Sequence, residues 1–234
     1  TGSTGDGYGF AEAVGHTVTE LSPSLTGLNL AGGDFSPLQG LTLKNVGVSV
    51  FADGKLIYAK QGEALFTHYG ISGPTILSAS SVINGVKADK FMLKIDLKPA
   101  LERETLSARV LRDFNLNLNK EIKNSLDALL PKSLIPLIIK RAGIPEYKKP
   151  NSITVKERER LVFALKNLDF EITGTRGFNE AVITRGGVCV KEINPKNMES
   201  KLIKGLRFCG EVLDLDAFTG GFNLQIAFST GKAA

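Results

Sequence analysis

The sequence has no long hydrophobic run, and its first residues do not have the pattern of a leader segment. No apolar stretch reaches the roughly 18 residues that a membrane-spanning helix requires. The first residues also lack the basic segment followed by an apolar segment that marks a signal peptide. The sequence therefore predicts no membrane partner and a cytoplasmic location.

Cysteine is scarce, because Cys189 and Cys209 are the only two in 234 residues. They have neither the spacing of a metal site nor the number expected of a disulfide framework. We expect both to be reduced thiols in the core and expect no metal site.

An initiator methionine is missing, and the chain opens with a glycine-rich stretch from Thr1 to Gly7. This stretch is either a loop that faces a ligand or only the glycine-rich start of a helix. Such a start inside a loop is unusual for a natural protein, so we expect the sequence to be a fragment of a longer one.

Positive charge is concentrated in one part of the chain. Residues 101–168 hold 14 Lys and Arg against 8 Asp and Glu, whereas all other residues hold 15 against 16. A basic segment can bind nucleic acid, but here Lys and Arg alternate with Glu, as on solvated helices. The segment also has few aromatic residues for base stacking and no nucleic-acid motif, so nucleic acid is not the expected partner.

With 42% hydrophobic residues the chain can bury a core of one or two domains. Residues 6–15 have the composition of a short helix that ends at a glycine. Alternation at Val46, Val48 and Val50, followed by the turn pair Asp53-Gly54, predicts a β-hairpin. We expect a helix over 73–81, with Ser72 as its cap rather than a nucleophile, and a strand over 90–97.

After Pro99 the hydrophobic residues no longer alternate with polar ones but recur at the spacing of a helix. Leu106, Val110 and Phe114 recur at this spacing, and Thr154 with Glu157 forms a capping-box pattern. We predict a small helical insert over 101–168, with further short helices at 120–130 and 132–142. Strand patterns return after it, at residues 170–173, 181–184 and 188–190, so the insert interrupts a β region.

A glycine-rich segment near the C-terminus is the strongest candidate site. Residues 206–208 alternate as on a strand that ends at Gly210, and Glu211 places a carboxylate at its edge, where ligands of α/β sheets bind. Gly220 and Gly221 open an apolar helix over about 221–233, whose free N–H groups can face a flavin ring that becomes anionic. The alternative is a turn and a helix that only pack. The predicted flavin contacts here are Gly210, Glu211, Gly220, Gly221, Phe222, Asn223, Leu224 and Gln225.

These segments resemble the YhiN/BaiN-like family of predicted NAD(P)/FAD-dependent oxidoreductases. The resemblance is carried by residues 205–225, and other family-like segments follow the same order along the chain, at residues 1–8, 62–74 and 184–200. It implies an α+β, multidomain fold: a β-barrel-like domain with a helical insert, between remnants of a Rossmann-like FAD-binding domain. The corresponding division is residues 1–20 and 191–234 for the FAD-binding parts, 21–100 and 169–190 for the barrel, and 101–168 for the insert.

The resemblance also implies a function. The intact protein would pass hydride from NAD(P)H through FAD to an unknown small molecule. The family's Gly-x-Gly-x-x-Gly fingerprint is absent from this sequence, so we expect the fragment to lack its N-terminal Rossmann segment. We therefore expect the fragment to bind FAD weakly or not at all and to be inactive alone. The alternative is a basic nucleic-acid-binding or structural module on a vestigial flavoprotein fold.

Two further segments are candidates for the same site. Thr184, Gly186 and Gly187 lie in a turn that the resemblance places beside the cofactor, although a plain hairpin turn fits equally. His68 is the best candidate for proton handling, because its ordinary pKa is near neutrality. It can equally position a ligand or satisfy a backbone carbonyl.

Overall fold

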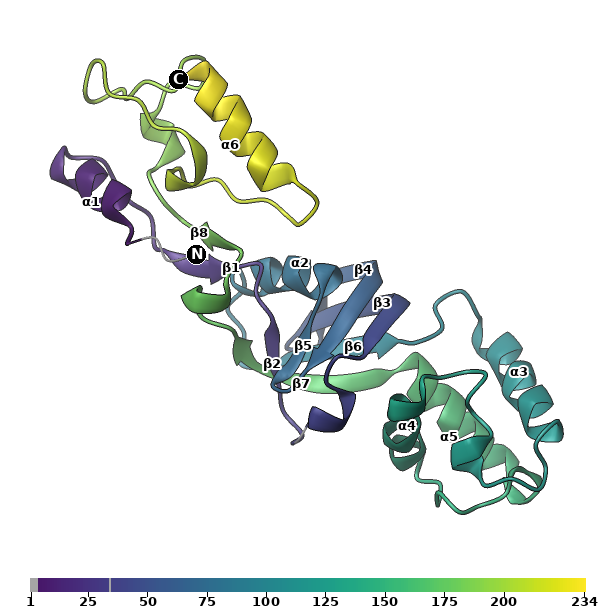
Figure 1. The fold of residues 1–234 in the computed structure, drawn as a ribbon. Coiled ribbons are helices and arrows are strands. Elements are labelled where there is room, and N and C mark those ends of the chain that lie inside the picture. Colours follow the sequence, from purple (N-terminus) through teal and green to yellow (C-terminus); the bar gives the residue numbers. More distant parts are fainter. Residues whose placement is uncertain (1–3, 34) are drawn as a thin grey trace. The chain divides into compact units, whose positions relative to one another are not determined.

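A computed structural model describes residues 4–33 and 35–234 (Figure 1). The first three residues of the glycine-rich opening lie outside the described residues. The chain forms two compact units, and the boundary between them falls inside two of the strands and one of the helices. Unit 1 comprises Thr1–Asn29, Ile76–Lys87 and Gly174–Ala234, and unit 2 comprises Leu30–Thr75 and Ala88–Thr173.

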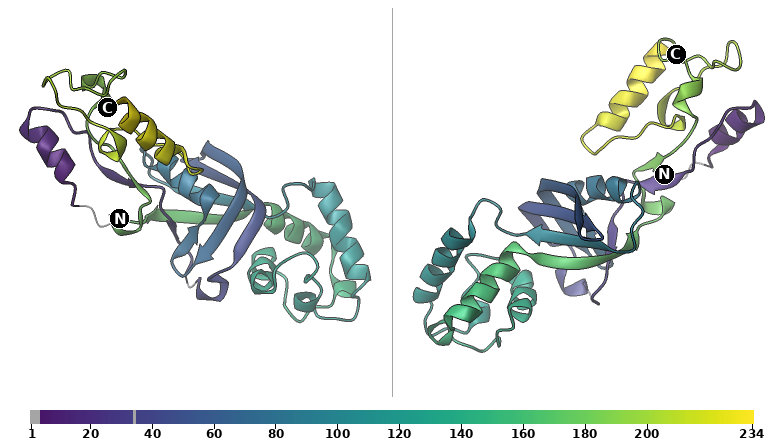
Figure 2. Two further views of the ribbon diagram at one scale, coloured as in Figure 1. Left: turned by 45° about the horizontal axis from the view of Figure 1, so that its top comes forward. Right: turned by 180° about the vertical axis from the view of Figure 1, so that it is seen from behind.

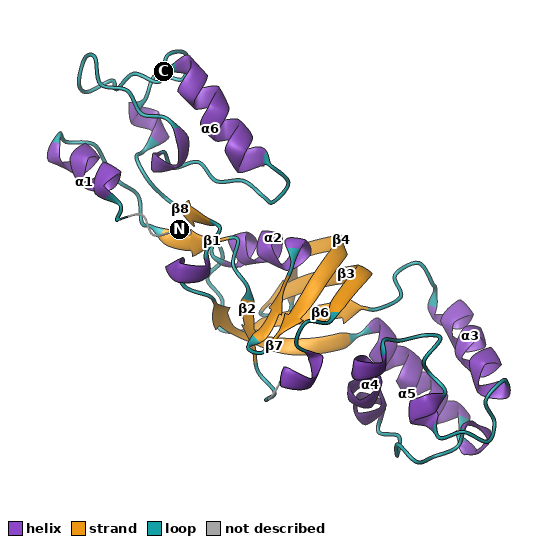
Figure 3. Ribbon diagram, viewed as in Figure 1, coloured by secondary structure: helices purple, strands orange, loops and turns teal. Residues whose placement is uncertain are grey.

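The β-strands form a closed barrel and a separate two-stranded ladder (Figure 3). The order around the barrel is β2-β5-β4-β3-β6-β7. Its strands are β2 (Leu28–Leu30), β3 (Thr42–Ala52), β4 (Lys55–Thr67), β5 (Gly70–Ser72), β6 (Phe91–Asp96) and β7 (Leu168–Thr175).

The predicted hairpin is confirmed as β3 and β4, which pair antiparallel around Asp53 and Gly54. Both turn residues have positive φ, 46° and 81°, as the tight turn requires. Alternate residues of β3 point into the core, and Val46, Val48 and Val50 are buried. The barrel core also contains an aromatic cluster of Phe35, Phe66 and Phe170.

The helical insert lies between β6 and β7 in unit 2, and α3, α4 and α5 group together in each view (Figure 2). These helices are α3 (Arg103–Asn115), α4 (Ile135–Ala142) and α5 (Val155–Lys166). The helix predicted over 120–130 is wrong, since this stretch has only a 3-10 turn, Ile122–Asn124. Polar residues there favour local turns over a helix, and the Ile122 N–H donates to the Lys148 carbonyl instead.

Unit 1 contains α1 (Asp6–Ala13), most of α2 (Pro74–Ile83) and α6 (Phe222–Ala233). It also contains the ladder of β1 (Ser22–Ser24) and β8 (Ile183–Arg185). A small hydrophobic core joins segments far apart in sequence: Ala11, Val188, Ile193, Met198, Phe208 and Leu213.

The strands predicted at 188–190 and 206–208 are wrong. Among the described residues, Val188 makes only isolated bridges, to Val18 and Leu213, and Arg207 makes one with Glu199. Alternation alone does not make a strand, because a strand also needs a neighbour along its length to satisfy its backbone groups.

The predicted α+β class, with its barrel and helical insert, is confirmed. The finer division into four segments and the Rossmann-like character of the two ends stay predictions. None of the helices in the described residues is long and apolar enough to cross a bilayer.

Candidate functional site

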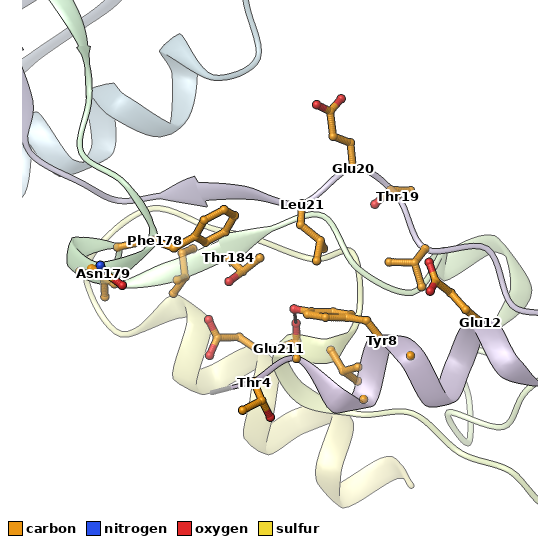
Figure 4. A pocket seen from close by; sticks show the side chains of 18 residues that line it. Thr4, Tyr8, Glu12, Thr19, Glu20, Leu21, Phe178, Asn179, Thr184 and Glu211 are labelled. Atoms are coloured by element: carbon orange, nitrogen blue, oxygen red, sulfur yellow. Dashed lines mark hydrogen bonds between the residues drawn. The ribbon is translucent and has the colours of Figure 1, made fainter. Parts of the chain in front are cut away.

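A cleft with a volume of about 950 Å³ lies entirely within unit 1 (Figure 4). Three segments that are distant in sequence form its walls. The first contains α1 and the chain that follows it, the second surrounds β8, and the third is the turn at Glu211 and Val212. Two of the predicted cofactor contacts, Thr184 and Glu211, therefore line one cleft.

Tyr8 extends from α1 toward Glu211 and Leu21 in this cleft (Figure 4). Its hydroxyl donates to the Glu211 carbonyl over 3.5 Å, a long hydrogen bond. Burial raises the pKa of Tyr8, and the negative charge of Glu211 adds to this, whereas a hydrogen bond with Thr184 lowers it. The phenol therefore stays protonated at neutral pH and can donate a hydrogen bond to a ligand.

The start of α1 forms part of the cleft wall. Gly5 occupies the N-cap position with φ 77°, and no side chain caps the helix. Gly9 also lines the cleft, and a Cβ added there would meet no atom within 4 Å. This wall therefore presents backbone and open space where other residues would place a side chain.

Glu211 sits in the short 3-10 turn Gly210–Val212, in place of the strand edge that we predicted. The turn depends on Gly210, which has φ 75°. The side chain of Thr230 in α6 accepts the Gly210 N–H over 2.9 Å. This bond ties the turn that carries Glu211 to the last helix.

Gly186 and Gly187 are buried and have positive φ, but they do not line the cleft. A Cβ on Gly186 would lie 2.2 Å from the Glu20 carbonyl oxygen, and one on Gly187 would lie 2.5 Å from the Val212 oxygen. Both glycines therefore allow close packing against the chain's own backbone. Because Glu20 and Val212 line the cleft, this packing positions two of its walls.

The start of α6 has no side-chain cap, and its N-cap Gly221 has φ 89°. The Asn223 side chain bonds both backbone groups of Ala217, which fixes the loop before the helix. The predicted contacts Gly220 to Gln225 are not among the residues that line the cleft. The phenylalanine and leucine of this start are exposed, Phe222 at 59% and Leu224 at 64%.

His68 lies in unit 2, in the turn between β4 and β5, and is exposed. Its ring meets the Tyr69 ring edge-on at 5.1 Å. Its predicted role in proton handling stays a prediction.

A Ser–His–Glu triad in unit 1, of which the serine and the histidine are buried, has the hydrogen-bond arrangement of a serine hydrolase but not its access. His16 lies 2.9 Å from a Glu192 oxygen and 2.7 Å from the Ser200 Oγ. That Oγ also accepts the N–H groups of Leu202 and Ile203, and Ser200 is 7% exposed. Its lone pairs are engaged and it does not line the unit 1 cleft, so Ser200 is structural.

Comparison with known proteins identifies the family. Residues 22–183 match the family model described as "HI0933-like protein barrel and H2TH domain". The match covers more than half of the chain and includes the barrel and the helical insert. The chain belongs to this family. The resemblance to the YhiN/BaiN-like flavoproteins, predicted from the motifs, is confirmed.

Curated relatives of this HI0933-like chain are enzymes. A 3-dehydro-bile acid delta(4,6)-reductase of Clostridium scindens is 30% identical and covers 100% of this chain and 57% of the relative. A ribosomal RNA dihydrouridine synthase of Escherichia coli is 30% identical, and the alignment covers 99% of this chain and 56% of the relative. A ribosomal RNA dihydrouridine synthase of Haemophilus influenzae is 34% identical, and the alignment covers 99% of this chain and 55% of the relative. The chain thus spans little more than half the length of each.

FAD is the cofactor that the HI0933-like family implies, and the cleft fits a flavin group. Its volume falls within the roughly 300–1,000 Å³ of ligand pockets. Tyr8 and Phe178 offer aromatic surfaces, Thr184 and Glu211 offer polar groups, and Gly9 leaves room for a ligand. These five residues are the ones that would hold the cofactor in this cleft.

Sequence reasoning missed Tyr8 and Phe178 in this HI0933-like chain. Tyr8 lies in the family-like segment of residues 1–8, and this resemblance could have indicated a cofactor contact. Its apolar neighbours suggested only one face of a helix. Nothing near Phe178 in the sequence indicates a site, because the residue reaches the cleft only through the fold.

Proposed function

We propose that this chain is part of an FAD-dependent oxidoreductase that reduces a carbon–carbon double bond conjugated to a carbonyl group. NAD(P)H would supply the reducing equivalents. Support comes from the names of the relatives, a delta(4,6)-reductase of a 3-dehydro-bile acid and dihydrouridine synthases. A 3-oxo steroid with a Δ4 bond and the uracil ring of uridine both contain such a conjugated bond.

The observation that carries the proposal is the convergence of Tyr8, Thr184 and Glu211 in one cleft. The sequence motifs independently indicate Thr184 and Glu211 as cofactor contacts. A bound flavin supplies the hydride chemistry, and the protein supplies binding, orientation and electrostatics.

Two residues of the cleft have separate proposed tasks. The Glu211 carboxylate would accept hydrogen bonds from hydroxyl groups of the cofactor, because an ionised carboxylate is a strong acceptor. Tyr8 stays neutral and donates a hydrogen bond to the carbonyl oxygen of the substrate, which polarises the conjugated bond. His68 does not line this cleft, and its role in proton handling stays a separate proposal.

We further propose that the longer protein is needed for activity. This sequence lacks the glycine fingerprint that binds the pyrophosphate of FAD. α6 has no buried residue, and its Phe228 is 71% exposed. An FAD-binding segment elsewhere in the longer protein is the partner that we propose for this apolar helix.

Flavin binding by the longer protein tests the proposal. We expect the purified protein to carry flavin, seen by its visible absorption, and to oxidise NAD(P)H when a conjugated enone is added. Glu211→Gln should weaken FAD binding about tenfold or more, since it removes charge-assisted hydrogen bonds. Glu63→Gln, the same change at an exposed position of β4, should leave FAD binding unchanged.

Tyr8→Phe separates binding from catalysis. It should keep FAD bound and lower turnover of the enone about 100-fold, as loss of one oxyanion donor does. A protein that binds no flavin after reconstitution would contradict the proposal and leave the structural-module alternative.

A further inference from the structure

A second hollow lies on the helical insert, within unit 2, where α3 and α5 pack against each other (Figure 2). Its volume is about 490 Å³. We call this hollow the insert groove. Its lining consists of the apolar residues Ala108, Leu111 and Val162 and the polar residues Arg103, Glu104, Ser107, Arg158 and Glu159.

Exposed hydrophobic side chains lie in the insert groove and beside it. Leu111 lines the groove and is 42% exposed. On α5, Val155 and Phe163 are four residues before and four residues after the lining residue Glu159, so all three lie on one face of the helix. Val155 is exposed, and Phe163 is 58% exposed. This face therefore offers apolar surface that a protein partner would cover.

The charged residues of the insert groove are unpaired. Each helix contributes two adjacent residues of opposite charge, Arg103 and Glu104 on α3, and Arg158 and Glu159 on α5. In the part of the chain that the structure describes, none of these four side chains makes an ion pair. The groove therefore presents two cations and two anions that have no partner of opposite charge in their own chain.

Other charged residues of the same helices are paired within the chain. Arg109 of α3 lies 2.9 Å from the Asp113 carboxylate one turn further along the helix. Glu157 of α5 lies 2.7 Å from the Lys148 ammonium group. The unpaired charges of the insert are thus grouped in the groove, beside its exposed apolar surface.

The charge of the lining favours a second copy of this chain as the partner. Two guanidinium groups and two carboxylates give the lining no net charge, so neither a polyanion nor a polycation is favoured. In a twofold dimer the same patch forms both sides of the interface. A patch with equal numbers of both signs can then place its arginines against the glutamates of the other copy.

We propose that the insert groove is a self-association surface, on which two copies of this chain pair about a twofold axis. Leu111 and Phe163 form the apolar centre of the contact, and the arginines of each copy bond the glutamates of the other. A contact centred on one groove is small, so we expect reversible, concentration-dependent association and not a permanent dimer. The proposal goes beyond the proposed function and uses no residue of the flavin cleft.

Sedimentation equilibrium of the full chain, over a series of protein concentrations, measures this association. We expect the average mass to rise with concentration from that of one chain toward that of two. High salt should weaken the association, because it screens the charges on the rim of the contact.

Charge reversal at two exposed positions tests the groove itself. Arg103→Glu leaves three carboxylates against one guanidinium group, and Glu159→Arg leaves three guanidinium groups against one carboxylate. Each change occurs on both sides of a twofold contact, so each variant alone should associate about tenfold or more weakly than the parent. An equal mixture of the two variants should regain association, because an acidic groove then meets a basic one. Such recovery also excludes misfolding as the cause of the loss.

The apolar centre is tested by Phe163→Ser. This change removes an exposed ring and should weaken association about fivefold or more, because the ring is buried only in the dimer. Phe10→Ser is the matched control, since Phe10 lies on α1 in unit 1 and is also exposed. It should leave association unchanged.

Three results would overturn the proposal. One is a chain that stays monomeric at every concentration in low salt, which would leave the groove to a different protein. Another is association that neither charge reversal weakens, which would place the contact elsewhere, such as on the exposed face of α6. The third is a mixture of the two reversal variants, both folded by circular dichroism, that associates no more than either variant alone. None of these results depends on flavin, so failure here leaves the proposed redox function standing.

Discussion

Single glycines in unit 1 have two different physical roles. Gly9 has open space where a side chain would be, whereas Gly186 and Gly187 have backbone there. The Thr19 N–H donates to the Gly187 carbonyl over 2.8 Å, and the Val188 N–H donates to the Val212 carbonyl over the same distance. These bonds hold the chain on both sides of the glycine pair. The pair therefore positions the segments that form the cleft walls and does not contact the ligand space itself.

Gly187→Ala should destabilise the protein by about 2–5 kcal/mol, because its Cβ would collide with backbone and its φ of 142° suits glycine. Urea unfolding measures the change. Gly231→Ala, in a helix with no atom near its Cβ, should instead stabilise by up to about 1 kcal/mol. Equal stability of the Gly187 variant and the parent would refute the packing role.

At the scale of elements, α5 depends on a charged capping box. Thr154 Oγ1 accepts the Glu157 N–H, and the Glu157 carboxylate accepts the Thr154 N–H. Lys148 donates to both oxygens of the same carboxylate, at 2.7 and 2.8 Å. The hydrogen bond from Lys148, followed by that from the Thr154 backbone, lowers the pKa of Glu157 from 4.5 to about 2.

This lowered pKa predicts a pH dependence of stability. Glu157 contributes its full stabilisation above pH 4.5, and the contribution is lost as the pH falls from 4.5 to about 2. Glu157→Gln keeps a capping side chain without the charge, so it should cost at most about 1 kcal/mol at neutral pH and flatten the acid response. Urea midpoints between pH 2 and 7 measure this, with Glu159→Gln on the same helix as the control. An unchanged acid response in Glu157→Gln would exclude this carboxylate as its source.

The elements that could be predicted from sequence are those with local signals. The Asp53-Gly54 turn and the Thr154 capping box are set by residues a few positions apart, and both are confirmed. The strands predicted at 188–190 and 206–208 would have needed neighbouring strands from elsewhere in the chain. The alternating residue pattern alone therefore gave a wrong prediction there. The site divides in the same way: motifs indicated Thr184 and Glu211, whereas Phe178 reaches the cleft only through the fold.

At the scale of the whole molecule, the chain is a barrel with a helical insert and a second unit that contains the candidate flavin cleft. It spans little more than half the length of its relatives, and the last helix has no buried residue. Both observations support the proposal that the longer protein completes the site.

A crystal structure of the longer protein with FAD tests the central claim most directly. Our account predicts that the flavin lies in the unit 1 cleft, with a cofactor hydroxyl on the Glu211 carboxylate and the flavin ring against Tyr8 or Phe178. Flavin density elsewhere, with Glu211 and Tyr8 both out of contact with it, would contradict the account.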